Sequence, residues 1–131
     1  MTERGLLDDR LQFIKHKGHA IYVIDLSECS AKEMLLLLEM TRASVARHAP
    51  GSLLCLVDLA GAHFDKDVAT KAKEVLVHDR PYVKKSAWVG FESLPHVYYE
   101  NFKSFSQRDF PLFKTREEAL EWLVADEVVH G

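Results

Sequence analysis

An uninterrupted apolar run, SLLCLVDL (Ser52–Leu59), passes through a short loop into the segment DKDVATKAKEVL (Asp65–Leu76), whose apolar residues recur at helical spacing. The run is typical of a buried strand. After the loop, Asp65 can accept hydrogen bonds from the free backbone N–H groups of a first helical turn. A buried strand followed by a capped amphipathic helix is a βα unit, so this stretch predicts the α/β class.

The preceding residues predict a β-hairpin and a helix. The segment LQFIKHKGHAIYVIDL (Leu11–Leu26) alternates apolar and other residues, and Lys17-Gly18 suits a tight turn. The second half of the segment is more uniformly apolar, which favours an inner strand. Ser30 and Glu33 have the spacing of a capping box, in which each side chain binds a backbone N–H of the other residue. They therefore open the helix AKEMLLLLEMTRASVARH.

The rest of the chain continues this alternation. VKKSAWVGF (83–91) is predicted to be a strand, a helix follows with Pro95 in its first turn, and FPLF (110–113) is a short extended piece. Thr115 and Glu118 repeat the capping-box spacing and open the helix TREEALEWLVAD. The predicted fold is α/β: a mixed four- to five-stranded sheet started by a β-hairpin, with about four helices packed on it.

The length of 131 residues predicts a single domain over residues 1–131. Its core is expected over about residues 11–126, which is enough chain to bury a stable interior without disulfides or metal. We expect Val57, Trp88 and Leu123 to share one interior.

Composition and the amino terminus favour an ordinary globular protein of the cytoplasm. The formal net charge is −3, so we expect no global attraction to nucleic acid or to an anionic membrane. The opening MTERGLLDDR is charged and lacks the apolar stretch of a signal peptide, and no apolar run is long enough to span a membrane. Cys29 and Cys55 follow no metal-ligand spacing; Cys55 is expected in the core and Cys29 as a neutral thiol.

A hairpin followed by IYVIDLSECSAKE, SLLCLVDLAGAHFDKD, RPYVKKSAWVGF and FKTREEALEWL resembles the STAS domain superfamily. Within it the chain is most similar to the SpoIIAA-like group, also described as STAS/SEC14-like. The resemblance covers residues 11–126, and VDLAGAHF and FKTREEALEWL are its most specific pieces. It implies the SpoIIAA-like (STAS) fold and a small regulatory or ligand-binding domain rather than an enzyme.

The resemblance also directs attention to the start of the helix that follows the central strand. STAS domains that are anti-sigma-factor antagonists carry a phosphorylatable serine there, which is modified by a kinase that is also the binding partner. A phosphate at that place meets free N–H groups and the positive end of the helix dipole. In this chain the matching position is Lys66, between Asp65 and Asp67, and no hydroxyl follows before Thr70. We therefore expect a module that lacks the serine switch.

The Asp58–Asp67 loop is the predicted partner-binding element. Its candidate residues are Asp58, Gly61, His63, Asp65, Lys66 and Asp67. The same loop allows an enzyme hypothesis, in which Asp58, His63 and Asp65 form a polar cluster at the carboxyl end of a strand, where open α/β sheets bind ligands. A structural interpretation is favoured, with the carboxylates ending the strand and capping the helix and the imidazole facing water.

No other pattern predicts catalysis, a cofactor or a metal site. His16 and His19 flank the hairpin turn closely enough to share a metal ion, but no third ligand motif is near, so an exposed hairpin end is favoured. No nucleophile-elbow motif occurs, and neither cysteine has a base partner in the sequence. We expect no catalytic residue, no cofactor and no metal.

The first helix carries more apolar surface than one core needs. Leu36, Leu37 and Met40 project to a different side from the stripe expected to pack on the sheet. They are either covered by a neighbouring helix of the same domain, or they form an intermolecular contact such as a homodimer interface or a lipid-facing site. Both explanations remain open.

Aromatic side chains gather in VKKSAWVGF and in LPHVYYENFKSFSQRDFPLF, which together contribute Trp88, Tyr98, Tyr99, Phe102 and Phe105. Tyr98, Phe102 and Phe105 are most simply core residues. The SEC14-like description also allows a pocket for an apolar small molecule or lipid between this helix and the sheet.

The leading hypothesis is a non-enzymatic STAS-like regulatory or protein-interaction module. It forms a homodimer, has an unidentified protein partner and has no nucleic-acid partner. The alternative is a carrier or sensor of an apolar small molecule or lipid, with a peripheral membrane contact as a further option.

Overall fold

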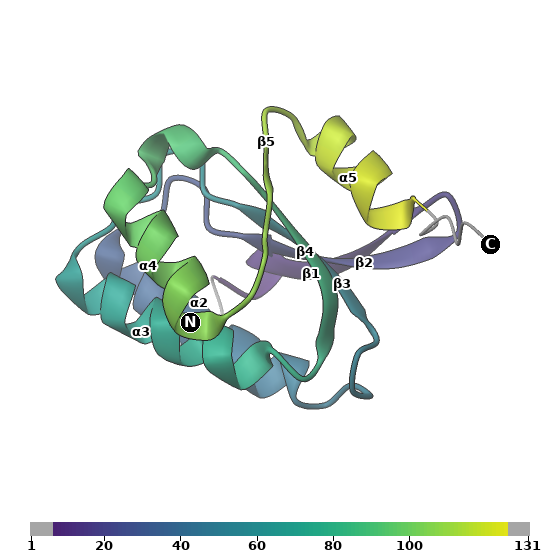
Figure 1. The fold of residues 1–131 in the computed structure, drawn as a ribbon, viewed down its shortest axis with the longest axis horizontal. Helices are drawn as coiled ribbons and strands as arrows, with labels where there is room; N and C mark the ends of the chain where they lie inside the picture. Colours follow the sequence, from purple (N-terminus) through teal and green to yellow (C-terminus); the bar gives the residue numbers. More distant parts are fainter. Residues whose placement is uncertain (1–6, 126–131) are drawn as a thin grey trace.

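The computed structural model describes residues 7–125 and contains one five-stranded sheet with helices on both faces (Figure 1). A short 3-10 helix, η1 (Asp8–Arg10), precedes β1 (Leu11–His16) and β2 (His19–Asp25), which pair antiparallel. The Lys17-Gly18 turn between them has positive φ at both residues, as a tight hairpin turn of this kind requires. The predicted hairpin is confirmed.

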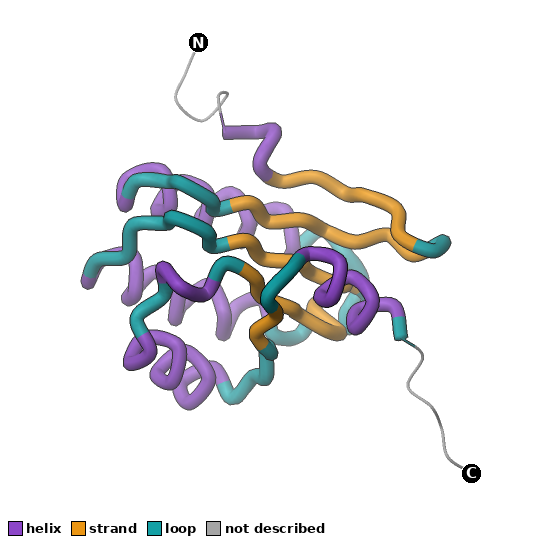
Figure 2. The backbone as a smooth tube through the Cα atoms, turned by 90° about the horizontal axis from the view of Figure 1, so that it is seen from above, coloured by secondary structure: helices purple, strands orange, loops and turns teal. Residues whose placement is uncertain are grey.

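Helices and parallel strands then alternate in the predicted order. They are α2 (Ala31–Val45), β3 (Leu53–Asp58), α3 (Lys66–Asp79), β4 (Val83–Val89), the 3-10 helix η2 (Phe91–Ser93), α4 (His96–Ser106), β5 (Leu112–Phe113) and α5 (Arg116–Val124). The strand order is β1-β2-β3-β4-β5, and every pair after the hairpin is parallel. Figure 2 shows the strands lying side by side in this order. The predicted α/β class and mixed sheet are confirmed.

Side-chain caps define the starts of three helices. Ser30 Oγ accepts from the Glu33 N–H at 3.1 Å while the Glu33 carboxylate accepts from the Ser30 N–H at 2.9 Å, so this capping box is complete. Asp65 caps α3 as predicted. At α5, Thr115 accepts from the Glu118 N–H, but the Glu118 carboxylate accepts from the Thr115 hydroxyl and not from its backbone. The second capping box is therefore only half formed.

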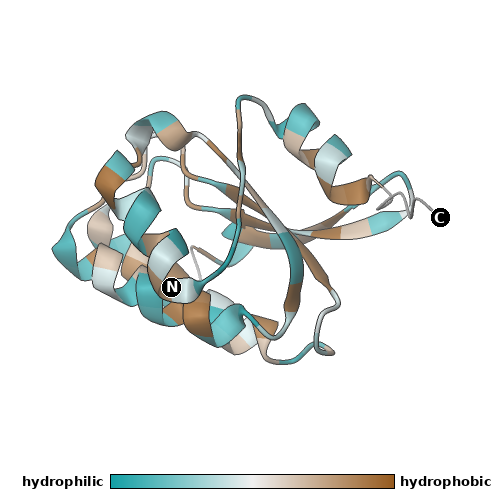
Figure 3. Ribbon diagram, viewed as in Figure 1, coloured by the Kyte–Doolittle hydropathy of each residue, from teal (hydrophilic) through white to brown (hydrophobic). Residues whose placement is uncertain are grey.

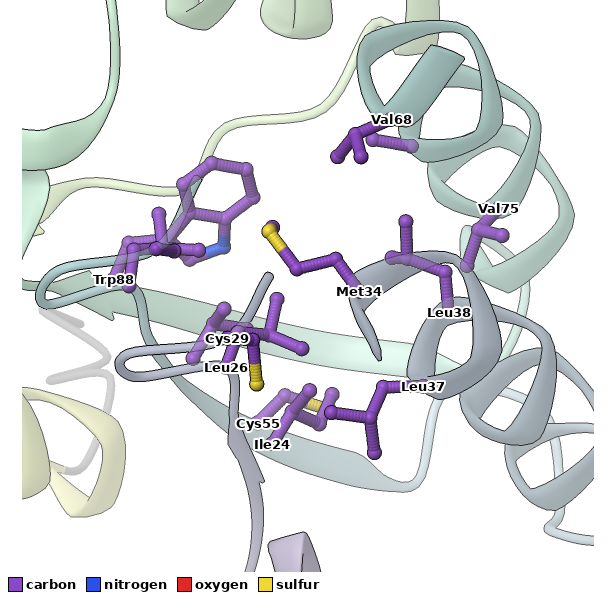
Figure 4. Packing of buried hydrophobic residues seen from close by; sticks show 14 of the residues in the cluster. Ile24, Leu26, Cys29, Met34, Leu37, Leu38, Cys55, Val68, Val75 and Trp88 are labelled. Carbon is purple, nitrogen blue, oxygen red and sulfur yellow. The ribbon is translucent and has the colours of Figure 1, made fainter. Parts of the chain in front are cut away.

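One face of the sheet is covered by α2, α3 and α4 (Figure 1). In Figure 3 these helices carry apolar and polar positions on the same coils, as helices do that bury one side. Figure 4 shows part of the resulting core, with Met34, Leu37 and Leu38 of α2 and Val68 and Val75 of α3 close to Ile24, Cys55 and Trp88 of the sheet. Each large apolar side chain buried in this way stabilises the fold by about 1.5–3 kcal/mol.

Of the described helices, α5 covers the opposite face. Its smaller cluster consists of Ile21, Val23, Leu56, Ala87, Val89, Ala119 and Leu123. Alternate residues of the inner strands point to the two faces, which explains why the run at β3 is apolar throughout. Leu123 packs on this face, whereas Val57 and Trp88 pack on the other. The expectation that the three share one interior is wrong, because the sheet separates them.

The apolar surplus of α2 is covered within the domain. Leu37 and Met40 are 0% and 8% exposed and belong to the larger cluster, and Leu36 is partly buried against it. Of the two explanations that the sequence left open, intramolecular cover is therefore the one found for Leu37 and Met40.

In α4 the burial of aromatic residues differs from the expectation at one position. Phe102 is buried, but Phe105 is 60% exposed, so the interpretation of Phe105 as a core residue is wrong. Tyr99 is buried instead. Its hydroxyl donates to the Phe110 carbonyl at 3.0 Å, and the centre of its ring lies 6.2 Å from the centre of the Trp88 ring. A satisfied hydroxyl allows a tyrosine to be buried at little cost.

Candidate functional site

The carboxyl ends of β2 and β3 meet two arginines from distant parts of the chain. Asp25 and Asp58 end these strands and are register partners. Oδ2 of Asp58 accepts hydrogen bonds from Nε and Nη2 of Arg116 at 3.0 and 2.8 Å, and its Oδ1 accepts from the Ala60 N–H. The Asp58 side chain is only 13% exposed. This pair ties α5 to the end of β3.

Asp25 extends the cluster toward η1. Its Oδ1 accepts from the backbone N–H and the hydroxyl of Ser27, and lies 3.7 Å from Nη1 of Arg10 and 3.9 Å from Nη2 of Arg116. Arg10 also donates to the Ser27 carbonyl. The two carboxylates and two guanidinium groups balance in charge. The cluster therefore links η1, β2, β3 and α5 and carries no net charge of its own.

Sequence reasoning identified Asp58 but missed Asp25, Arg10 and Arg116. The four residues come from β3, β2, η1 and α5, so no spacing along the chain joins them. One signal was available: Asp25 and Asp58 each end an apolar run, and neighbouring parallel strands end at the same edge of a sheet.

The loop between β3 and α3, called the β3–α3 loop, is held by the loops on either side of it. The Gly61 N–H donates to Ser93 Oγ at 2.8 Å, which attaches the β3–α3 loop to η2. The His63 N–H donates to the Cys29 carbonyl at 3.0 Å, which attaches it to the turn before α2. These bonds hold the loop in place from both sides.

Two glycines allow the three loops to approach this closely. Gly61 has a φ of 71°, and a Cβ there would collide with the Glu28 carboxylate. Gly90 has a φ of 72°, and a Cβ there would collide with the backbone of Ala60. Residues other than glycine rarely adopt this left-handed backbone conformation. At Gly90 the Ala60 backbone also leaves no room for a Cβ atom.

The end of the β3–α3 loop and the first turn of α3 place four polar side chains at the surface. His63, Asp65, Lys66 and Asp67 are all exposed, and we call them the α3-entry surface. Asp65 Oδ1 accepts from a first-turn N–H at 2.8 Å, and both acidic groups lie at the positive end of the helix dipole. The surface therefore has a fixed backbone and alternating charge.

The three residues of the enzyme hypothesis are not joined to one another by any side-chain hydrogen bond or ion pair within residues 7–125. Asp58 binds Arg116, Asp65 caps α3, and His63 is exposed. This arrangement corresponds to the structural interpretation of these residues.

No three or more His, Cys, Asp or Glu side chains are grouped so as to hold a metal ion in the described part of the chain. Nε2 of His16, at the hairpin end, lies 2.6 Å from a carboxylate oxygen of Glu121. Burial raises the pKa of the Cys29 thiol and raises that of Cys55 to about 12. Both cysteines are therefore neutral at physiological pH.

The order of the strands also bears on what the carboxyl edge can bind. Open α/β sheets hold small ligands in a crevice at the point where the strand order reverses. Here the order runs from β1 to β5 without reversal, and α2, α3 and α4 cover the same face. The strand order therefore creates no crevice between neighbouring loops at this edge. Such an edge is better suited to contact with another macromolecule than to enclosing a small ligand.

An apolar cavity of about 60 Å³ lies between the sheet and the helices of the larger face. Trp88, Phe102 and Phe64 contribute to its lining, and so does Thr41, whose buried Oγ1 has no hydrogen-bond partner in the described structure. Tyr98, Tyr99 and Phe105 do not line it. Sites for drug-sized ligands typically have volumes of about 300 Å³ or more, so this cavity is small.

Within residues 7–125 we find no helix with both the length and the apolar character needed to cross a bilayer. No family model matches the chain, and no curated protein sequence matches it. The structure itself defines an α/β domain with a mixed sheet whose strands follow the order of the chain.

A solved structure has the same architecture: the anti-sigma-factor antagonist (STAS) domain protein from Planctomyces limnophilus. The two are similar with a TM-score of 0.58, over 88% of this chain and 98% of that one, at 15% sequence identity. The chain therefore has the STAS fold, as its sequence resemblance implied.

Proposed function

We propose that this chain is a non-enzymatic STAS-type regulatory or protein-interaction module, and that it contacts its partner through the α3-entry surface. The observation that carries the proposal is the fixed backbone of this surface. A loop held from both sides presents exposed charges without losing conformational freedom when a partner binds, and such pre-organisation favours recognition. The hydrogen bonds between Arg116 and Asp58 fix the end of β3 at the same edge of the sheet.

We further propose that the module works without a phosphorylated serine at this place. Lys66 occupies the first turn of α3, and the first hydroxyl after Asp58 in the sequence belongs to Thr70. That hydroxyl donates to the Lys66 carbonyl within the helix at 3.0 Å. The Lys66 ammonium and its acidic neighbours supply permanent charge where a phosphate would supply switchable charge.

The test compares Lys66→Glu with Lys15→Glu, an equal charge change on the exposed strand β1. Each tagged full-length chain is expressed in its own cells, the proteins that co-purify with it are quantified, and affinities are then measured with the purified partner. Charge reversal at a contact should weaken binding about tenfold, while the control stays within about twofold. Both variants should melt within about 1 °C of the wild type, because exposed substitutions cost little stability. Equal affinities for the two variants would move the contact away from α3.

A homodimer remains part of this proposal, and the structure changes how to test it. Leu37 is fully buried, so Leu37→Glu would unfold the domain instead of reporting on an interface. Phe105, which is 60% exposed on α4, is the better probe among the interface candidates. Phe105→Glu should convert the dimer to a monomer in sedimentation, and Ser104→Glu, also on an exposed position, is the control. A dimer that persists in Phe105→Glu excludes this face.

The alternative function is a carrier or sensor of an apolar small molecule. The observation in its favour is the apolar cavity, in which the Thr41 hydroxyl could bind a polar end group. Its small volume means that an acyl chain would have to displace α4 or α3. Native mass spectrometry of gently purified protein should then show a bound lipid, and fatty acids should raise the melting temperature. An apo mass without a thermal shift rejects the carrier function.

A further inference from the structure

A second hollow, of about 120 Å³, opens at the amino-terminal half of β4. It lies at the end of the strand opposite to the β3–α3 loop, because the Asp58 end of β3 pairs with the Val89 end of β4. Arg80, Lys84, Ser86, Arg108 and Asp109 line it together with their neighbours. The hollow therefore belongs to a different region from the α3-entry surface.

Arg108 is the central cation of this hollow. Its Nη1 donates to the Leu76 carbonyl at 3.1 Å, and its guanidinium carbon lies 5.9 Å from the centre of the Phe110 ring. No carboxylate of the described residues forms an ion pair with it within 4 Å. Burial, and to a smaller extent the like charge of Arg80, lower the pKa of Arg108, whereas Asp79 and Cys55 act in the opposite direction. Arg108 therefore has a buried carboxylate, Asp79, near enough to oppose the effect of burial, but it has no carboxylate in direct contact. An anion in the hollow would stabilise its charge further.

Cationic residues outnumber acidic ones in the lining of the hollow. Arg80 and Lys84 are exposed and neither forms an ion pair in the described part of the chain, and Asp109 is the acidic residue of the lining. The ammonium group of Lys85, a further lining residue, is turned to the other face of the sheet and donates to the Trp122 carbonyl. Three cationic residues and one acidic residue therefore line the hollow, and Asp79 is a second, buried carboxylate near Arg108. Lys84 also lines a hollow beside α5 on the other face of the sheet.

Ser86 adds an unused hydrogen-bond donor. The residue is 3% exposed, and its Oγ accepts from the indole Nε1–H of Trp88 at 3.2 Å. No acceptor for the hydroxyl proton of Ser86 is found among the described residues. A buried hydroxyl with a free proton at the lining of a cationic hollow is suited to bind an oxyanion.

We infer that the hollow is a binding site for a phosphate group, held by Arg80, Lys84 and Arg108 and by the hydroxyl of Ser86. A planar guanidinium donates two parallel hydrogen bonds to a tetrahedral oxyanion, and lysine adds a point charge. The volume accommodates a phosphate group but not a whole nucleotide, since sites for ligands of that size occupy about 300 Å³ or more. The phosphate can be free in solution or can be the head group of a lipid. Its binding would give the module a second, small-ligand input that is remote from the partner surface.

Calorimetry with inorganic phosphate tests the first source, with sodium chloride at equal ionic strength as the reference. Arg80→Gln and Lys84→Gln alter exposed residues and should fold normally. Each should weaken phosphate binding about threefold, and the double variant about tenfold, because each removes one partly screened charge contact. Arg47→Gln and Lys15→Gln are the matched controls, since both remove an exposed cation away from the hollow, and they should bind as the wild type does.

The second source is tested by flotation with phosphatidylcholine vesicles, with and without phosphatidic acid. Binding that requires phosphatidic acid, and is lost in the Arg80/Lys84 double variant but kept in the controls, assigns the site to a lipid phosphate. Binding of inorganic phosphate with the same pattern of variants assigns it to a soluble one. No binding in either assay, or equal loss in the controls, overturns the inference.

The two tryptophans provide a readout inside the protein. Phosphate that accepts from the Ser86 hydroxyl polarises the hydrogen bond to Trp88, so the indole N–H resonance of Trp88 should move during an NMR titration. Trp122 lies on α5 across the sheet and serves as the internal control. Equal movement of both resonances would indicate a general salt effect and contradict the site.

Discussion

The two faces of the sheet are stabilised in different ways. The face under α2, α3 and α4 holds the larger apolar cluster, in which the centres of the stacked Trp88 and Phe110 rings lie 4.2 Å apart. The face under α5 holds a cluster of seven buried residues, and a helix of nine residues closes it. The first face thus depends mainly on apolar burial, which salt does not screen as it screens ion pairs.

The second face depends in addition on ion pairs and hydrogen bonds at its edges, which we call the rim. Arg116 binds Asp58 at one end of α5, while Glu121 accepts from Lys17 at 2.5 Å and contacts His16 at the hairpin end. Lys85 donates to the Trp122 carbonyl at 2.8 Å and lies over the Trp122 ring. Only two residues of α5, Ala119 and Leu123, are fully buried, so these polar contacts add to its attachment, and salt weakens the ion pairs among them.

The largest effect is expected on the larger face, at Phe102. Phe102→Ala removes a ring that is 1% exposed and should lower the free energy of unfolding by about 4 kcal/mol, from the lost burial and the cavity that remains. Urea unfolding measures the loss. Phe105→Ala, the same change at an exposed position of the same helix, is the control and should cost no more than about 0.5 kcal/mol.

A smaller loss is expected on the α5 face. Leu123→Ala should cost about 2.5 kcal/mol, since a short terminal helix can shift to fill part of the space. Hydrogen exchange should show that α5 opens in this variant while α3 stays protected. A loss as large as that of Phe102→Ala, with uniform exchange, would mean that the two faces unfold as one unit.

The larger face also contains a buried carboxyl group, Asp79, whose effect on stability should depend on pH. Burial raises the pKa of Asp79, and hydrogen bonding to His78, 2.9 Å away, and the charges of Arg108 and Arg42 only partly oppose this. Since the folded state holds the proton more tightly, Asp79 lowers stability increasingly as pH rises from about 4, the unfolded value, through its raised pKa. Asp79→Asn should therefore raise the melting temperature at pH 7 and have little effect below pH 4. A gain that is independent of pH would contradict this.

The smallest effect concerns the rim. A double-mutant cycle of Arg116→Gln and Asp58→Asn should give a coupling of about 0.5–1 kcal/mol, because the arginine is 43% exposed and solvent weakens the pair. The coupling should decrease toward zero near about 1 M salt. A coupling that salt leaves unchanged would show that hydrogen-bond geometry, and not charge, holds α5.

Much of the fold could be predicted because its signals are local. Ser30 with Glu33, and Asp65 before α3, mark helix starts through hydrogen bonds over three residues. The Lys17-Gly18 turn likewise sets the hairpin. The half-formed capping box at Thr115 shows the limit of such signals. Thr115 offers both a backbone N–H and a hydroxyl, and the Glu118 carboxylate accepts from the hydroxyl.

The candidate site was predicted only in part, for a physical reason. The residues of the β3–α3 loop are consecutive and were found, whereas Arg10 and Arg116 reach the same edge from opposite ends of the domain. The hollow near β4 was missed for the same reason, since Arg108 and Lys84 meet only after α4 has folded back on the sheet.

The amino-acid sequence determined the succession of strands and helices along the chain and where most of the helices begin, because hydrophobic spacing and caps act over a few residues. The order of the strands within the sheet came from the structure. Only the tertiary structure decided that Leu37 is covered by its own domain, that Phe105 is not, and that Leu123 lies across the sheet from Trp88. These outcomes depend on which face each helix covers, and that is settled by the packing of segments distant in sequence.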